Sequence, residues 1–141
     1  MFESNRKSEI VNHKSSVMHL KIETKEKFHE IKIGETHIAA NMTAELAVLL
    51  NPYLQNEIKN IILRLTDVQV IDTEAAGALV SIQQNFYDNG ASFVICEVQP
   101  QLEKMLDEAE LLEIMNITPT LSEAWDIVQM EEIEREFFEA E

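Results

Sequence analysis

The sequence has few of the residues that break regular structure, cross-link a chain or carry positive charge. Its 141 residues include three glycines, three prolines and one cysteine, beside 11 lysines and arginines. A single cysteine excludes an internal disulfide. With 45% hydrophobic residues, the scarcity of glycine and proline excludes a disordered chain and indicates a globular one. The length suffices for one domain with a proper core.

The small number of basic residues also limits the partners of the protein. Aspartate and glutamate number 26, so the formal net charge is −15. Nucleic acid needs a basic face to meet its phosphates, and an anionic membrane surface repels an acidic protein, so we expect neither partner. The charge fits a protein partner with a basic patch, although a solvated acidic surface that binds nothing fits it equally well.

Motifs for enzymatic chemistry are also missing. The sequence contains no phosphate-cradling glycine loop, no nucleophile elbow and no Cys/His pair with partners. Its four histidines (His13, His19, His29 and His37) have no metal-ligand spacing, so we expect them at the surface and not in a metal site. Cys96 lies in an apolar run and is expected to be a core thiol. We therefore expect no catalytic residues, no metal and no cofactor.

Hydropathy gives a further set of exclusions. The N-terminus has no apolar signal segment, and no stretch approaches membrane-spanning length. We therefore expect a cytoplasmic protein that does not insert directly into a membrane. Residues 1–16 are polar with scattered charges, and we expect them to form a flexible N-terminal segment.

The period of the hydrophobic pattern changes within residues 68–79. β-Branched residues precede position 72, which is typical of a short buried strand, whereas apolar residues recur at helical spacing after it. Asp72 or Thr73 is the expected N-cap, because either side-chain oxygen can accept from a free backbone N–H. The start of a helix carries free N–H groups and the positive end of the helix dipole, so this position favours an anion such as phosphate.

The rest of the chain alternates between strand and helix patterns. The expected strands are 17–23, 28–33, 61–65 and 92–98, with a short extended piece at 37–40 and a candidate edge strand at 115–117. The expected helices start at Asn41 or Thr43 with an interruption at Pro52, at residue 73 with an end at Asn89–Gly90, near Pro100, and at Thr120 with Glu123 in a capping box. The first two strands form a hairpin and the later ones alternate with helices, which predicts parallel pairing in an α/β fold.

The segment Val-Ile-Asp-Thr-Glu-Ala-Ala-Gly-Ala-Leu at 70–79 resembles the Asp-Ser-Ser-Gly-Leu-Gly signature of STAS domains, the anti-sigma factor antagonist family. The order of the expected elements is also similar, although Glu74 and Ala75 depart from the signature. The resemblance implies an α/β fold with a single STAS-like domain, in which about four helices pack against a mixed four- to five-stranded sheet. We assign this domain to residues 17–141, including an acidic C-terminal helical extension.

The resemblance also implies which residues act. In the STAS family the hydroxyl residue directly after the aspartate is phosphorylated, which corresponds to Thr73 here. The helix that carries it docks on the partner, which implies partner binding by Asp72, Thr73, Glu74 and Gly77. From residue types alone, Thr73 can instead be an unmodified N-cap, and Glu74 can hold a fixed negative charge in a module that does not switch. A glycine inside a helix, such as Gly77, suggests close approach of a neighbouring helix or of a docked partner.

The resemblance therefore predicts a regulatory protein-binding module and not an enzyme. Its implied partners are an anti-sigma factor that is a serine-threonine kinase, and a phosphatase, through which it would regulate transcription. Two alternatives are a STAS-like subunit that binds the ATPase of a membrane transport assembly, and a small α/β enzyme with an unrecognised site. We also expect Ile127 and Ile133 to pack on the domain or in a homodimer. Phe137 and Phe138 should pack in the same way, unless they belong to a disordered acidic tail.

Overall fold

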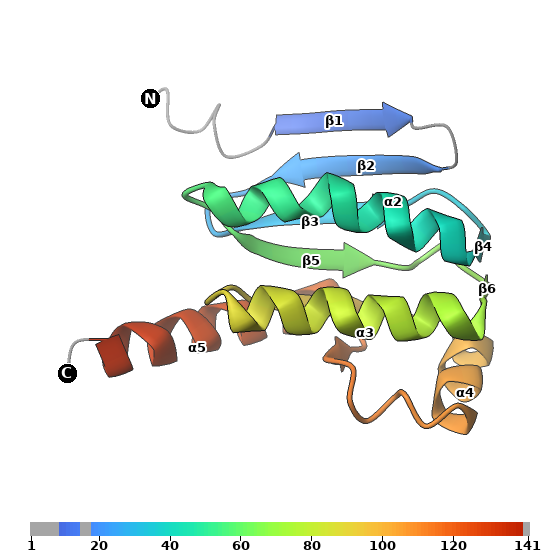
Figure 1. Ribbon diagram of the computed structural model, residues 1–141. Helices are drawn as coiled ribbons and strands as arrows, with labels where there is room; N and C mark the ends of the chain where they lie inside the picture. The colour runs from blue at the N-terminus through green and yellow to red at the C-terminus, as the bar shows by residue number, and fades with distance from the viewer. Residues whose placement is uncertain (1–8, 15–17, 140–141) are drawn as a thin grey trace.

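A mixed β-sheet runs through the chain, and helices pack on both of its faces in the computed structural model (Figure 1). The structure describes residues 9–14 and 18–139. Six strands form the main sheet in the order β1-β2-β3-β5-β7-β8, and β4 and β6 form a separate pair. The expected α/β class, with a mixed sheet and four α-helices, is confirmed.

After β3, a helical segment separates each strand of the main sheet from the next. The strands are β1 (Glu9–Lys14), β2 (His19–Thr24), β3 (Phe28–Ile33), β4 (His37–Ile38), β5 (Asn60–Arg64), β6 (Val70–Ile71), β7 (Phe93–Cys96) and β8 (Ile117–Thr118). The helices are α2 (Ala40–Leu50), the 3-10 helix η1 (Asn51–Gln55), α3 (Thr73–Asp88), α4 (Pro100–Glu108) and α5 (Leu121–Glu139).

The direction of the strands changes at β3. Strands β1, β2 and β3 pair antiparallel, whereas β3, β5, β7 and β8 pair parallel. The first four residues of β5 are all buried, because a central parallel strand is covered on both faces. The strand expected at 61–65 is therefore confirmed as β5, and it lies in the middle of the sheet.

Two hydrophobic cores lie on opposite faces of the sheet. The larger core joins Leu63 of β5 to α2 and to Leu79 of α3. The smaller core joins Ile62 of β5 to Val128 of α5 and includes Cys96. Successive side chains of a strand point to opposite faces of the sheet, so neighbouring residues of β5 pack in different cores. Burial raises the pKa of the Cys96 thiol to about 12, and the expected core thiol is confirmed.

The N-terminal region contains a strand that the sequence pattern does not predict. A flexible segment is expected over 1–16, but Glu9–Lys14 form β1, which pairs antiparallel with β2 over its whole length. The segment Glu-Ile-Val-Asn-His-Lys has only two neighbouring apolar residues, so it lacks the alternation that indicates a half-buried strand. Backbone hydrogen bonds to the edge of β2 form without such a pattern. Residues 1–8 and 15–16 of this expectation lie outside the described residues.

The start of α2 differs from the expectation and its end agrees with it. The helix begins at Ala40 with Ala39 as the N-cap, so the expected caps Asn41 and Thr43 are wrong. The Thr43 hydroxyl donates to the carbonyl oxygen of Ala40 at 2.7 Å, so it is used within the first turn of the helix. Pro52 divides the helical pattern as expected, because α2 stops before it and η1 contains it.

Two other helix ends agree with the sequence signals. The N–H of Glu123 donates to Oγ1 of Thr120 at 3.1 Å at the start of α5. Asn89 is the C-cap of α3, and Gly90 follows with a φ of 76°. This left-handed conformation is accessible to glycine at little cost, which explains why the helix ends there.

Helix α5 is the long acidic helix that the sequence predicted, but part of its apolar side is not covered. Ile127 packs against the smaller core, whereas Ile133 is 65% exposed. Phe137 and Phe138 are 67% and 70% exposed. These three residues do not pack on the domain, and packing on a second subunit stays a prediction. The C-terminal half of α5 extends past the end of α3 (Figure 1), and its helical structure rules out the alternative of a disordered tail.

The histidines occupy two kinds of position. His19 and His37 are exposed as expected, but His29 is only 4% exposed, so the expected surface position is wrong for it. Both ring nitrogens of His29 are hydrogen-bonded, which allows burial of a polar ring. The side chain of His13 lies outside the described residues.

Candidate functional site

The candidate site is the junction between β6 and α3, where the hydrophobic period changes in the sequence. Strand β6 ends at Ile71 and α3 begins at Thr73, with Asp72 as the N-cap between them. The N–H of Asp72 donates to the carbonyl oxygen of Ile38 at 3.0 Å, and its own carbonyl accepts from the N–H of Ala76 at 2.9 Å. The backbone of Asp72 therefore ends a strand and starts a helix, as predicted.

The side chain of Asp72 does not cap α3. Its Oδ1 lies 2.7 Å from Nε2 of His37, and it makes no hydrogen bond to the first turn of the helix. Parallel pairing of β4 with β6 places His37 opposite Val70, which brings the imidazole to the start of α3. The cap position is therefore confirmed, but the expected capping hydrogen bond is wrong, because the carboxylate turns to the imidazole of His37 and not to the first turn of the helix.

Thr73 presents its hydroxyl to solvent in the first turn of α3. The side chains of Thr73 and Glu74 are exposed, and the Thr73 hydroxyl has no hydrogen-bond partner among the described residues. The first N–H groups of a helix have no carbonyl partner within it, and the helix dipole adds partial positive charge. A phosphate on Thr73 would therefore meet N–H donors, with the carboxylates of Asp72 and Glu74 beside it.

Gly77 lies one turn further along α3 and faces open space. A Cβ added at this position would have no heavy atom within 4 Å. Of the two explanations for this glycine, close approach of a neighbouring helix is wrong for the described part of the chain. The other explanation, a docked partner, stays a prediction.

Val70 adds an apolar side chain to this surface, which the sequence pattern did not indicate. It is 52% exposed, whereas Val68 and Ile71 are 0% and 2% exposed. The pattern predicted a buried strand, but β6 pairs with β4 in a two-stranded sheet. Alternate side chains of such a strand point outward. A partner docked at the start of α3 can therefore bury an apolar residue as well as polar ones.

A second group of charges lies where β5 and β7 end. Arg64 donates from Nε to Oε1 of Glu97 and from Nη1 to Oε2 of Glu30, both at 2.7 Å. Thr66 also donates to Glu97. Burial alone would raise the pKa of Glu97, but the hydrogen bonds from Arg64 and Thr66 outweigh burial and lower it. These groups satisfy one another, so they tie the strand ends together and offer no free base or nucleophile.

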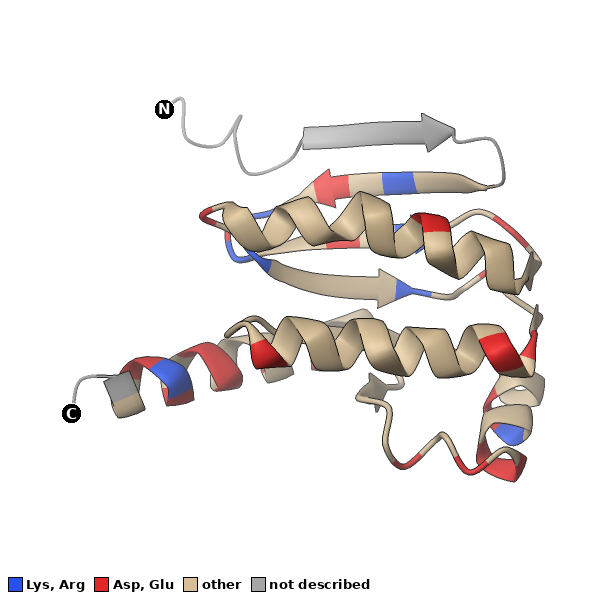
Figure 2. Ribbon diagram, viewed as in Figure 1, with Lys and Arg blue, Asp and Glu red and all other residues tan. Residues whose placement is uncertain are grey.

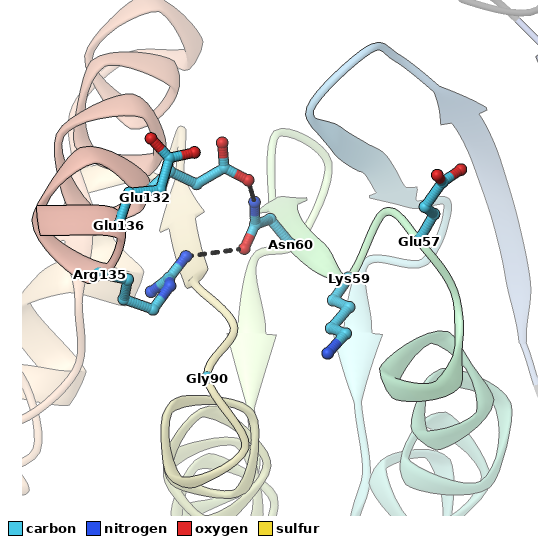
Figure 3. A pocket seen from close by; sticks show the side chains of 7 residues that line it. All are labelled: Glu57, Lys59, Asn60, Gly90, Glu132, Arg135 and Glu136. Carbon is cyan, nitrogen blue, oxygen red and sulfur yellow. Dashed lines mark hydrogen bonds between the residues drawn. The ribbon is translucent and has the colours of Figure 1, made fainter. Parts of the chain in front are cut away.

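Three pockets among the described residues lie away from the start of α3. Two of them, with volumes of about 410 and 420 Å³, lie beside His29 and beside Trp125. The third, of about 190 Å³, lies at the start of β5 and below α5 (Figure 3). There Asn60 donates to Glu132 at 2.7 Å, and Arg135 donates to Asn60 at 3.3 Å. The central groups of this third pocket are therefore bonded to one another.

The charge of the surface restricts what it can bind. Figure 2 shows acidic residues at the start of α3 and along α4 and α5. Within the described ranges, no three His, Cys, Asp or Glu side chains are grouped as metal ligands. None of the helices in these ranges combines the length and the hydropathy needed to cross a bilayer. A partner for the start of α3 must therefore tolerate or neutralise negative charge.

The sequence matches the family model of the STAS domain over residues 20–124. This range includes β2 through the start of α5 and therefore the whole candidate site. The chain is also similar to a Thermotoga maritima protein that carries the provisional name of anti-sigma factor antagonist. The two are 30% identical over 87 residues, which are 62% of this chain and 73% of the relative.

Solved structures share the fold at low sequence identity. The NMR structure of TM1081 from Thermotoga maritima has a TM-score of 0.68 and 22% identity, and the match covers 86% of this chain and 95% of that one. The anti-sigma factor antagonist SpoIIAA in its unphosphorylated form has a TM-score of 0.61 and 14% identity, over 78% of this chain and 96% of that one. The Bacillus cell fate determinant SpoIIAA in its phosphorylated form has a TM-score of 0.56 and 14% identity, over 77% of this chain and 98% of that one.

Proposed function

Because the chain belongs to the STAS domain family, we propose that it is a regulatory protein-binding module of the anti-sigma factor antagonist type, and that phosphorylation of Thr73 switches its binding. The observation that carries this proposal is the exposed hydroxyl of Thr73, at the first residue of α3 and directly after Asp72. A kinase can reach this hydroxyl without unfolding the domain. A phosphate attached to it lies at N–H groups that favour an anion.

The switch is a local change of charge on a docking surface. Phosphorylation adds nearly two negative charges to a surface that already holds Asp72 and Glu74. The imidazole of His37 lies 2.7 Å from the carboxylate of Asp72 on one side of this surface. When a partner docks, the phosphate loses water, and without a basic group opposite it this loss costs more than a typical interface gains. The unmodified form therefore binds and the phosphorylated form is released.

The proposed docking surface combines one apolar side chain, several polar side chains and a glycine that has no side chain. It consists of Val70, Asp72, Thr73, Glu74 and Gly77. Val70 supplies apolar area, Glu74 supplies negative charge, and Gly77 leaves room for the partner to approach the helix backbone. A partner with an apolar pocket for Val70, and with its basic groups placed away from Thr73, would complement this surface in the unmodified form.

The partner that we propose is an anti-sigma factor with serine-threonine kinase activity, and a phosphatase removes the phosphate. Two observations support this assignment: the provisional name of the Thermotoga maritima relative, and the existence of SpoIIAA structures in unphosphorylated and phosphorylated forms. Docking withdraws the anti-sigma factor from its sigma factor, so transcription is regulated in the cytoplasm. The chain itself binds and is modified, and it catalyses no reaction.

Affinity capture with three baits tests this function. The baits are the unmodified protein, Thr73→Glu and Ser81→Glu. Ser81 is exposed on the same helix and serves as the control for an added charge. We expect the unmodified protein and Ser81→Glu to capture the kinase from native cell lysate, and Thr73→Glu to lose it. Incubation with the captured kinase and ATP should then place phosphate on Thr73, as mapped by mass spectrometry.

The same experiment separates the parts of the proposal. Phosphate found only at other residues, or no phosphate, would overturn the switch at Thr73 but not the binding module. Equal capture of the kinase by all three baits would show that it docks on another surface. Capture of a transporter ATPase in place of a kinase would favour the subunit of a transport assembly.

A further inference from the structure

The second half of α5 has its polar and apolar faces reversed. Its inward face is polar, because Glu131 accepts hydrogen bonds from the Ser92 hydroxyl at 2.6 Å and from the Tyr87 hydroxyl at 2.9 Å. One turn later, Arg135 donates to Asn60 at 3.3 Å (Figure 3). It also donates to the Ser92 hydroxyl at 3.2 Å. A helix that only covers a domain turns its apolar residues inward and its polar residues outward. This half of α5 does the opposite.

The outward face of the same half is apolar. Met130, Ile133 and Phe137 are 55%, 65% and 67% exposed, and their spacing of three and four residues places them on one side of the helix. We call these three residues the α5 stripe. Five of the eight large hydrophobic residues exposed in the described part of the chain belong to α5. The exposure is therefore concentrated on one helix, unlike the scattered single residues of an ordinary surface.

The contacts of α5 prevent the stripe from turning toward the domain. Ala124 and Val128, in the first half of the helix, are both 0% exposed in the smaller core. Rotation of α5 would pull them out of that core. It would also separate Glu131 and Arg135 from their partners, and polar groups buried without partners are costly. Within the described part of the chain no segment can cover the stripe, so its occupant is sought in a second molecule.

The charge of α5 decides between a second copy of this chain and a different partner. The helix contains seven Asp or Glu residues and one Arg, and Glu134 and Glu136 are exposed beside the stripe. Two copies packed stripe to stripe would bring like charges together across the interface. A basic amphipathic helix would instead bury its apolar face on the stripe while its lysines or arginines pair with these carboxylates.

We propose that the α5 stripe is a second docking surface, and that its occupant is an amphipathic helix with basic flanks from another protein. The C-terminal half of α5 and the start of α3 lie at opposite ends of the molecule (Figure 1). The two docking surfaces therefore do not overlap. The protein joins two partners, of which only the one at α3 is controlled by Thr73.

Anisotropy titrations of the full chain with a labelled synthetic peptide test this surface. The probe is an amphipathic helix of leucine and lysine, and a scrambled peptide of the same composition reports the attraction of charge alone. We expect saturable binding that the triple variant Met130→Gln/Ile133→Gln/Phe137→Gln weakens by at least about tenfold, because most of the buried apolar area is lost. Thr73→Glu should bind the peptide as the unmodified chain does.

The matched control removes exposed apolar residues elsewhere. The control variant is Val48→Gln/Ile114→Gln, whose replaced residues are 72% and 62% exposed. Neither this variant nor the triple variant changes the net charge of the protein. Far-UV circular dichroism checks the fold of both variants. Equal affinity of the triple variant and this control, or equal binding of the scrambled peptide, would overturn the proposal. So would a dimer of the unmodified chain in light scattering that the triple variant abolishes, because the occupant would then be a second copy.

Discussion

Nε2 of His37 lies 2.7 Å from Oδ1 of Asp72, which follows it by 35 positions in the sequence. Asp72 is the N-cap of α3, yet its carboxylate turns to the imidazole and leaves the first turn of the helix without a side-chain cap. Both side chains are about half exposed, so the pair adds little stability. The pair holds one carboxylate to the side, so no side chain caps the N–H groups beside Thr73, where we propose that a phosphate is received.

Thr73 and Thr120 both lie near the start of a helix, and replacing each by alanine distinguishes a switch residue from an N-cap. Thr120 accepts a hydrogen bond from the N–H of Glu123, so Thr120→Ala should lower the free energy of unfolding by about 1 kcal/mol. The Thr73 hydroxyl makes no such bond among the described residues, so Thr73→Ala should change this free energy by less than about 0.5 kcal/mol. Urea unfolding measures both. Equal costs for the two substitutions would mean that Thr73 is a structural cap.

The substitution Gly77→Ala should have opposite effects on the stability of the fold and on partner binding. Alanine is more favourable than glycine inside a helix by about 0.8–1 kcal/mol, and the added Cβ meets no heavy atom within 4 Å. Gly77→Ala should therefore raise the free energy of unfolding by about that amount in urea titrations. The same substitution should weaken binding of the partner that docks on α3. A gain in stability with unchanged partner affinity would remove Gly77 from the docking surface.

The sequence predicted the start of α3 because the signal there is local. Residues before Asp72 belong to a strand and residues after it belong to a helix, and each kind of element has its own hydrophobic period in the sequence. His37 carries no such signal. Its contact with Asp72 depends on the pairing of β4 with β6, and these strands have two residues each. A contact between distant positions through so short a pairing leaves no periodic pattern to detect.

Two other features could not be predicted for related reasons. The exposure of Val70 depends on the place of β6 in a two-stranded sheet, which the residue types do not reveal. The apolar residues of α5 recur at helical spacing, and this pattern predicted that Ile133 packs on the domain or in a homodimer, but it did not show which way the helix faces. The orientation of the helix is instead decided by the hydroxyls of Ser92 and Tyr87, which bind Glu131 from other parts of the chain.

Glu131 should contribute more to stability than the exposed glutamates of α5. Burial, and then the neighbouring Glu131 carboxylate, raise the pKa of Tyr87. Glu131→Ala leaves the hydroxyls of Tyr87 and Ser92 without this acceptor, so the free energy of unfolding should fall by about 1–3 kcal/mol. Glu134 is exposed on the same helix. Glu134→Ala should change the free energy of unfolding by less than about 0.5 kcal/mol. Similar values for the two variants in urea unfolding would contradict the reversed faces of α5.

His29 should make the stability of the protein depend on pH. Its ring is 4% exposed and lies against Tyr53, with 4.1 Å between the ring centroids. Nε2–H donates to the carbonyl of Ile58 at 2.8 Å, which leaves Nδ1 to accept from the hydroxyl of Thr24 at 3.0 Å. Burial lowers the pKa of His29 below its usual 6.5, and the hydrogen bond to Ile58 offsets only part of this effect.

Acid should therefore destabilise the protein through this residue. As the pH falls from 6.5 toward the lower pKa of the folded state, the unfolded chain binds a proton that the folded chain does not. The free energy of unfolding should decrease in this window, whereas above it His29 is neutral in both states and adds no slope. His29→Gln keeps an N–H donor and should flatten the slope between about pH 7 and pH 5, while His19→Gln, at an exposed position, should retain it. Urea unfolding across this range measures the slopes, and an unchanged slope in His29→Gln would assign the titration to another group.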